Sequence, residues 1–220
     1  MHKSALIVGG GVYGAACTRY LLEEGWRCTV VDEDPLCLAA RAILTEGTDG
    51  EVSFVQGGVA RGLDLFTSDA PDALIPTVPF HLLAALVTWS TGHLPWTEGA
   101  AAAAAAISPT LLVSSSEGTL TLSYNRDGTC LPACPAPPRC PATGEHWPCP
   151  LHALLADALP GALVLESVQL GPGVGGLRGG DVAAVLARAR EEETLVVGTA
   201  CRCHGVVTAL KKRDRVLQNF

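Results

Sequence analysis

The chain has 220 residues, of which 48% are hydrophobic and 17% charged, so it can bury the core of one substantial domain. The net charge is −7, from 15 basic and 22 acidic side chains. This balance excludes a general nucleic-acid-binding protein, because such a protein carries a basic surface. The only lysines are Lys3, Lys211 and Lys212, and no GxxxxGK[ST] loop occurs. A catalytic lysine in mid-chain and a P-loop NTPase are therefore also excluded.

Cysteine content and hydropathy bear on the compartment. Nine cysteines are present, and no signal-like segment precedes the first apolar run, so we expect a reducing, cytoplasmic location. In that compartment clustered cysteines indicate metal binding or redox chemistry more often than disulfides. Residues 73–97 lack charge, but prolines interrupt them. We therefore expect a buried strand and helix there and no membrane insertion.

The first 90 residues alternate between strand and helix patterns. Apolar runs predict strands at 4–9, 28–32, 52–55 and 73–78, and helical patterns cover 12–24 and 80–89. This alternation is typical of a parallel sheet with helical crossovers. The sequence thus predicts an α/β fold, a Rossmann-like doubly wound and mainly parallel sheet, with residues 1–99 as its dinucleotide-binding half.

Residues 100–220 are predicted to form a second α/β half, giving one compact domain overall. Seven alanines at 100–106 are consistent with either a helix or a linker. A hairpin is predicted at 111–124, and residues 125–150 form a Cys/Pro-rich insert that excludes regular helix or central strand. Beyond the insert, helix, strand, helix and strand are expected at 151–159, 162–170, 181–190 and 194–199, with a short helix starting near Gly205.

A glycine-rich loop follows the first predicted strand. Gly9, Gly11 and Gly14 match GxGxxG, with a strand before them and a helix after them. Gly9 permits the tight turn, Gly11 lets the backbone approach a pyrophosphate, and Gly14 allows close packing of helix on strand. The phosphates would lie at the helix N-terminus. Asp32, at the end of the second strand, would bind a ribose 2′-hydroxyl and favour NAD over NADP.

These residues carry a family resemblance. Residues 4–32 resemble the first βαβ unit of Rossmann NAD(P)- and FAD-binding proteins. Residues 72–79 resemble the fourth-strand region of saccharopine-dehydrogenase-like proteins and of the nucleotide-binding domains of Trk-type potassium-uptake regulators. The resemblance ends near residue 90. It implies NAD as cofactor, with FAD as the alternative, and places His81 near the nicotinamide as an acid or base; a histidine that only caps a helix is the competing interpretation.

Two cysteine groups are candidates for further chemistry. Cys130, Cys134, Cys140 and Cys149 lie among seven prolines and could ligate zinc or an iron–sulfur cluster, with His146 or His152 replacing one thiol. A rigid loop with unligated thiols is the alternative. Cys201, Cys203 and His204 follow the last predicted strand and could form a redox pair, a nucleophile with its base, or further metal ligands. Two packed cysteines in a loop are the alternative there. Whether the two groups meet in space is open.

A second GxGxxG match spans residues 171–176, with Arg178 following it. Pro172 departs from the dinucleotide pattern, so a substrate-holding or closing loop is preferred to a second cofactor site, with Arg178 as an anion donor.

The preferred function is a dinucleotide-binding, NAD-dependent oxidoreductase with a cysteine-ligated metal and an unidentified small-molecule substrate. Two alternatives stay open: a non-enzymatic subunit that senses NAD or redox state, and a metal-handling protein with a vestigial nucleotide loop. The composition does not decide whether the chain forms a homo-oligomer.

Overall fold

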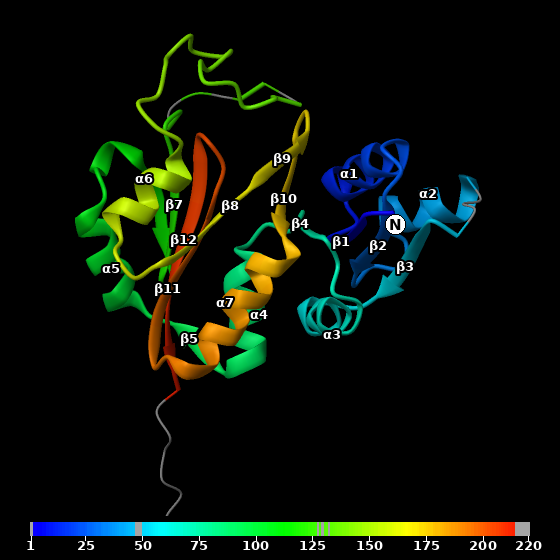
Figure 1. The fold of residues 1–220 in the computed structure, drawn as a ribbon, viewed down its shortest axis with the longest axis horizontal. Coiled ribbons are helices and arrows are strands. Elements are labelled where there is room, and N and C mark those ends of the chain that lie inside the picture. Colours follow the sequence, from blue (N-terminus) through cyan, green and yellow to red (C-terminus); the bar gives the residue numbers. More distant parts are fainter. Residues whose placement is uncertain (1, 47–49, 127, 129, 132, 214–220) are drawn as a thin grey trace, which may run out of the picture.

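The computed structural model describes residues 2–46, 50–126, 128, 130–131 and 133–213, and Figure 1 shows them arranged around two sheets. The first sheet has the strand order β3-β2-β1-β4-β10-β9. Its first four strands are parallel, and β10 and β9 continue it in antiparallel fashion. The strands of this sheet are β1 (Ser4–Val8), β2 (Arg27–Asp32), β3 (Val52–Gln56), β4 (Ala73–Pro76), β9 (Val168–Gly171) and β10 (Val174–Arg178).

Helices cover both faces of the first sheet. Along β1 the side chains alternate: Ala5 and Ile7 enter the core beneath α1 (Val12–Glu23) and α2 (Leu38–Glu46). Leu6 and Val8 enter the opposite core, beneath α3 (Val59–Asp69). This period-two alternation with both sides buried is typical of a doubly wound sheet. The predicted Rossmann-like α/β fold is therefore confirmed.

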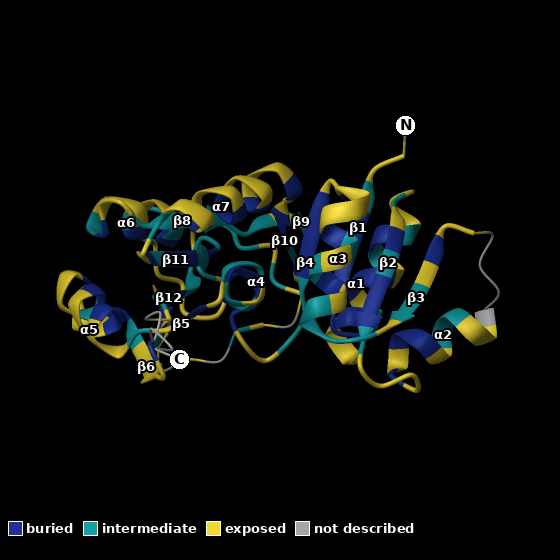
Figure 2. Ribbon diagram, turned by 90° about the horizontal axis from the view of Figure 1, so that it is seen from below, coloured by how far each residue is buried: buried dark blue, intermediate teal, exposed yellow. Residues whose placement is uncertain are grey.

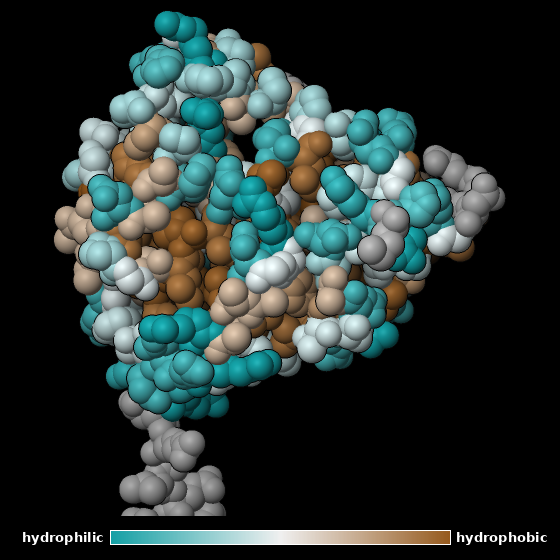
Figure 3. All heavy atoms as spheres, viewed as in Figure 1, coloured by the Kyte–Doolittle hydropathy of each residue, from teal (hydrophilic) through white to brown (hydrophobic). Residues whose placement is uncertain are grey.

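The second sheet has the order β6-β7-β12-β11-β8, and β5 pairs with β12. It is antiparallel except for the β8–β11 pair. Figure 3 shows hydrophobic residues at the surface over β11 and β12. The strands are β5 (His93–Pro95), β6 (Leu112–Ser116), β7 (Thr119–Ser123), β8 (Leu163–Glu166), β11 (Thr194–Ala200) and β12 (His204–Lys212), with a 3₁₀ turn at Pro109–Leu111.

Two helices form a layer that the sheets share. The core that contains α4 (Leu82–Thr91) and α7 (Gly179–Glu191) also takes residues from β1 and β4 of one sheet and from β11 and β12 of the other. The outer face of the second sheet packs against α5 (Thr97–Ala106) and α6 (Leu151–Ala158). Figure 2 colours the residues of these helices by burial, and the exposed residues lie on their outer sides. The two halves are thus joined by apolar packing as well as by the chain.

Three local predictions are refined by the structure. The alanine run is helical, as part of α5. The strand predicted at 162–170 is two strands, separated at Ser167. The short helix expected near Gly205 is wrong, because Gly205 belongs to β12 and pairs with both Ala200 and Leu122. Its successors Val206, Val207 and Thr208 are β-branched, which favours a strand.

The Cys/Pro-rich insert connects β7 to α6. Among its described residues the only ladder contact is the bridge between Arg139 and His146. In Figure 1 the insert arches over the second sheet towards the tip of the β9–β10 hairpin. There the Gly173 amide donates to the Cys134 carbonyl at 3.2 Å. Among the described residues no helix combines the length and apolar character needed to cross a bilayer.

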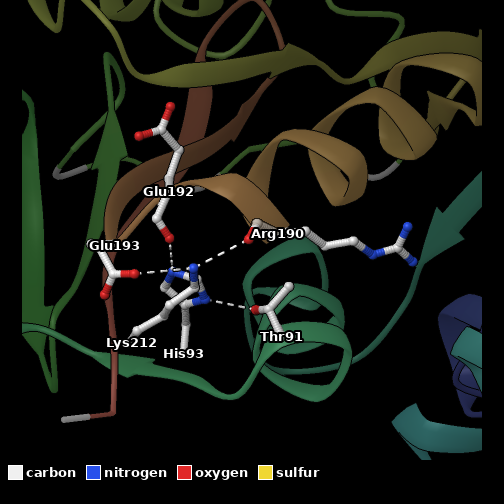
Figure 4. Close-up of polar contacts among 6 residues, drawn as sticks. All are labelled: Thr91, His93, Arg190, Glu192, Glu193 and Lys212. Carbon is white, nitrogen blue, oxygen red and sulfur yellow. Dashed lines mark hydrogen bonds and ion pairs between the residues drawn. The ribbon is translucent and has the colours of Figure 1, made fainter. Parts of the chain in front are cut away.

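At the far end of the second sheet, a buried histidine joins three elements. His93 is 0% exposed; its Nδ1 lies 2.7 Å from Thr91 Oγ1 and its Nε2 lies 3.1 Å from the carbonyl oxygen of Glu192. Lys212 reaches the Arg190 carbonyl and the Glu193 carboxylate beside it (Figure 4). These bonds satisfy carbonyl groups at the C-terminal end of α7, so the cluster is structural.

The glycine loop provides a test of the fold. A Cβ at Gly14 would overlap the Gly9 carbonyl oxygen, whereas a Cβ at Gly11 would meet no atom within 4 Å. Gly14→Ala should therefore lower the free energy of unfolding by about 1–3 kcal/mol, and Gly11→Ala should change it by less than about 0.5 kcal/mol. Urea titration followed by circular dichroism measures both. Equal decreases in the free energy of unfolding in the two variants would contradict this account of the loop.

Candidate metal and dinucleotide site

The glycine loop has the backbone geometry that close approach of a ligand requires. Gly9 has a φ of +106°, and a Cβ there would lie 2.7 Å from the Thr77 carbonyl oxygen. The Thr77 hydroxyl donates to the Gly9 carbonyl at 2.7 Å, which fixes the loop against the end of β4. Gly11 faces open space. Packing thus excludes a side chain at Gly9. At Gly11, the lack of a side chain leaves open space next to the backbone.

The first turn of α1 offers unused amide groups. Gly11 is the N-cap, no side chain caps the helix, and its first turn contains no acidic residue. The first four N–H groups of a helix have no partner within the helix, and together with the helix dipole they favour an anion. The turn that follows β1 therefore presents hydrogen-bond donors where the sequence predicts a pyrophosphate.

Asp32 lies at the end of β2, directly beside this loop. Its carboxylate accepts hydrogen bonds from the backbone amides of Gly10 and Asp34. One amide per oxygen leaves further acceptor capacity on both oxygens. Asp32 thus holds the glycine loop in place and keeps acceptor capacity for a further donor.

Cys201, Cys203 and His204 come together at the turn between β11 and β12. Their ligand atoms all lie within 4.8 Å of one another. The Leu151 amide donates to the Arg202 carbonyl at 2.8 Å, and the His152 amide donates to the Cys201 carbonyl at 3.3 Å. The first turn of α6 therefore uses its free amides to fix the backbone that carries the three side chains.

The separations within this group match one tetrahedral metal ion. The two sulfurs lie 4.0 Å apart, and His204 Nδ1 lies 3.2 Å from Cys203 Sγ and 3.9 Å from Cys201 Sγ. Zinc bond lengths in a regular tetrahedron give about 3.8 Å between two sulfurs and about 3.6 Å between sulfur and nitrogen. The two longer separations are close to these values and the third is shorter, so the three atoms are grouped compactly enough to contact one ion.

The protonation state of the group favours a thiolate. Hydrogen bonds from the Cys203 thiol, and then from His204 and the backbone amides of Cys203 and His204, lower the pKa of Cys201 to about 4 against the effect of burial. The hydrogen bond with Cys201, burial and the nearby Cys130 and Cys134 all raise the pKa of Cys203. The bond with Cys201 raises the pKa of His204. Thiolate and imidazole are the ligand types that zinc and iron bind.

The four cysteines of the insert are distributed unequally around this group. Cys130 Sγ lies 3.1 Å from His204 Nε2, on the side of the ring away from Cys201 and Cys203. Cys134 and Cys140 line the same cavity as the group. Cys149 lies apart from the cavity lining, where the Tyr124 hydroxyl, on a ring stacked against Trp147, donates to its carbonyl at 3.1 Å. The two cysteine groups therefore do meet, through three of the four cysteines of the insert.

A cavity of about 790 Å³ connects this group to α1, a volume typical of ligand pockets. It is visible in Figure 3 as a hollow below the insert. The sequence analysis did not identify the cavity residues of α1, although their helical spacing indicates that they share one face of the helix. No sequence pattern indicated that Trp147 and Gln169 would line the cavity. These additional lining residues include Val12, Tyr13, Ala16, Cys17, Tyr20, Asn125, Trp147 and Gln169.

Two of the remaining predicted residues, His81 and Arg178, lie away from the cavity. His81 is buried between α4 and β12, and its Nδ1 lies 2.8 Å from Thr208 Oγ1. The structure therefore does not bring His81 to the cysteine group. Arg178 is engaged by Glu166 and Asp181 on the surface. The glycines at 171–176 form the turn of the β9–β10 hairpin.

Both halves of the chain match known family models. Residues 4–82 match a family model described as the N-terminal domain of an uncharacterized protein. Residues 84–213 match the model described as the C-terminal domain of an uncharacterized protein. An uncharacterized protein of Archaeoglobus fulgidus is 37% identical over 214 residues, which cover 94% of this chain and 99% of that protein. The division of this chain at residue 99, and its organisation as one domain, stay predictions.

Two solved structures share weak similarity. The enzyme WbmG of Bordetella bronchiseptica in complex with NAD is 23% identical with a TM-score of 0.30, over 41% of this chain and 31% of that chain. The apo S-adenosylmethionine-dependent methyltransferase SibL is 19% identical with a TM-score of 0.31, over 96% of this chain and 51% of that chain. Similarity at this level carries no argument about function.

The buried His81 predicts a pH dependence of stability. Burial lowers its pKa from 6.5 to about 3, and within the described part of the chain its Nε2 is buried without a hydrogen-bond partner. Between pH 6.5 and 3 the unfolded chain binds a proton that the folded chain does not. Stability is therefore full above pH 6.5 and falls below it, by up to about 1.4 kcal/mol per pH unit.

The variant His81→Asn keeps a polar group near the position of Nδ1 and removes the titration. The difference in free energy of unfolding between wild type and variant should therefore shrink as the pH falls from 7.5 to 5. Urea unfolding at each pH measures it, and His146→Asn, at an exposed position, is the matched control. A pH slope unchanged in His81→Asn would contradict the neutral, buried histidine.

Proposed function

We propose that this chain, which belongs to the family defined by these N- and C-terminal domains, is an NAD-binding oxidoreductase with a metal centre at Cys201, Cys203 and His204. Gly9, Gly11 and Gly14 hold the pyrophosphate, and Asp32 holds the adenosine ribose. Hydride exchange belongs to the nicotinamide, while the protein supplies position and charge. The small-molecule substrate lies in the cavity between the two sites.

One observation carries the proposal. A single cavity is bordered by Val12 and Tyr13, in the first turn of α1, and by the Cys201–His204 group. Val12 and Tyr13 are 67% and 77% exposed, so they are available to a ligand that extends from the glycine loop. A dinucleotide on the loop and a metal on the thiols would therefore border the same space.

The donor set favours zinc over an iron–sulfur cluster. The three ligand atoms lie at separations suited to one ion, whereas the four cysteines that hold a 4Fe–4S cluster each bind a different iron atom. Two thiolates and one imidazole are a common zinc set. The carboxylate of Asp32 favours NAD over NADP, because it would repel a 2′-phosphate.

A second candidate function is favoured by the position of His81. The acid or base that the sequence predicted is buried outside the cavity, and a protein without such a group could report NAD or redox state without turnover. Oxidation of NADH with any acceptor would exclude this regulatory role.

The nucleotide site is tested with the variant Gly11→Ala. The new methyl group meets no protein atom within 4 Å, so only an incoming ligand would clash with it. Calorimetry should show NAD binding by wild type, weaker binding of NADP, and at least about a tenfold loss of NAD affinity in the variant.

Gly180→Ala is the matched control, because a Cβ there also meets open space. Equal NAD affinity in Gly11→Ala and wild type would contradict the site. Binding of FAD without binding of NAD would show that FAD, and not NAD, is the cofactor.

The metal site is tested with Cys201→Ser after purification without oxygen. Elemental analysis should find about one zinc per wild-type chain and substantially less in the variant, because a ligand is lost. Cys149→Ser, outside the cavity lining, should keep the metal, and Cys201→Ser should still bind NAD. Iron together with acid-labile sulfide in the wild type would reject zinc in favour of a cluster.

A further inference from the structure

The β9–β10 hairpin carries the Cys134 region of the insert. The Cys134 carbonyl accepts a hydrogen bond from the Gly173 amide and another from Gln169 Nε2, both at 3.2 Å. Gly173 has a φ of +76°, and a Cβ there would lie 2.8 Å from Ala133 Cα. The glycine-rich turn therefore admits the backbone of the insert at close range. The second GxGxxG match thus has a structural use that does not involve a nucleotide.

The sulfur of Cys134 accepts a backbone hydrogen bond. The Ala136 amide donates to it at 3.4 Å. Cys134 lines the same cavity as Cys203, and it lies near enough to contribute to the raised pKa of Cys203. Backbone hydrogen bonds therefore hold Cys134 against the β9–β10 hairpin, at the cavity that the Cys201–His204 group also lines.

The other cysteines of the insert are less suited to join the group. Cys130 faces His204 Nε2, whereas Cys201 and Cys203 face Nδ1. Cys149 lies outside the cavity lining. Cys140 belongs to a separate turn, in which the Gly144 amide donates to its carbonyl at 2.7 Å and its own amide donates to Glu145.

We propose that Cys134 is the fourth ligand of the metal centre, completing a Cys₃His tetrahedron with Cys201, Cys203 and His204. This inference rests on the metal centre proposed above. Cys134 lies outside the compact group of three, so metal binding draws the segment around it inward. Cys130 then accepts the hydrogen bond from His204 Nε2–H and acts as a positioning residue, because a metal-bound imidazole usually donates its second N–H to such a partner.

A four-ligand site has a definite role. Zinc sites with four protein ligands are structural, whereas catalytic sites keep one position open. The metal would therefore fasten the proline-rich insert over the cavity and leave the chemistry to the dinucleotide. A segment rich in proline buries few apolar groups, so a metal would supply the cohesion that it lacks.

The test is titration of full-length, metal-free protein with Co²⁺ and with Zn²⁺ against a competing chelator, without oxygen. In Cys134→Ser the thiolate-to-cobalt absorption should fall by about a third, because two thiolates remain of three. Its Zn²⁺ affinity should fall by more than the roughly 10- to 100-fold typical of an outer-shell partner. Cys134→His should keep the absorption bands of tetrahedral cobalt, since imidazole replaces the thiolate as ligand.

Three matched variants separate the possible roles. Cys140→Ser and Cys149→Ser should bind both ions as the wild type does. Cys130→Ser should keep the full thiolate-to-cobalt absorption with a Zn²⁺ affinity lowered roughly 10- to 100-fold. Circular dichroism of each variant establishes that it is folded.

Wild-type affinity and absorption in Cys134→Ser would overturn the assignment of the fourth ligand and leave the metal centre standing. A wild-type chain that binds neither ion would instead overturn the metal centre itself. The two failures are therefore distinguishable.

Discussion

The candidate site depends on hydrogen bonds from the first turn of α6 to the turn between β11 and β12. Pro150 precedes that helix and has no N–H, so the amides of Leu151 and His152 are the first available donors, and both bond the carbonyls of the turn. These bonds orient Cys201 so that the His204 amide points at its sulfur. Because α6 directly follows the insert, the same contact also anchors one end of the proline-rich segment.

The packing of α4 and α7 gives this local geometry its setting. Their side chains enter one apolar core with strands of both sheets, so the edge of the first sheet that carries β9 and β10 keeps a fixed distance from the second sheet. Close packing makes such an arrangement stiff. The hairpin, the β11–β12 turn and α1 therefore border a cavity of defined shape, although they belong to segments far apart in the sequence.

Features that depend on neighbouring residues were predictable from the sequence. The glycine loop is one, because strand, turn and helix follow each other within the first 24 residues. The Cys201–His204 triplet is another. The approach of Cys130 and Cys134 to that triplet was not predictable, because it depends on the path of an insert without regular structure. The burial of His81 was not predictable for a related reason: local spacing correctly puts it at the start of the helix after the fourth strand, but only the second sheet, packed on α4, buries it beside Thr208.

The second GxGxxG match shows why spacing alone is a weak guide. At Gly9–Gly14 the glycines leave open space at Gly11, where a ligand can approach, and the following helix supplies donors. At Gly171–Gly176 the same spacing occurs in a hairpin, and the space that its glycines free is filled by Tyr20 and by the backbone at Ala133. The first set of glycines thus leaves open space at Gly11, and the second set admits the protein itself. Tyr20 of α1 packs against Gly171 and the insert packs against Gly173, so the hairpin connects α1 to the segment that carries Cys134. If the metal and the dinucleotide bind as proposed, a movement of the insert on metal binding would change the space next to α1, and the coupling of the two affinities would be reciprocal.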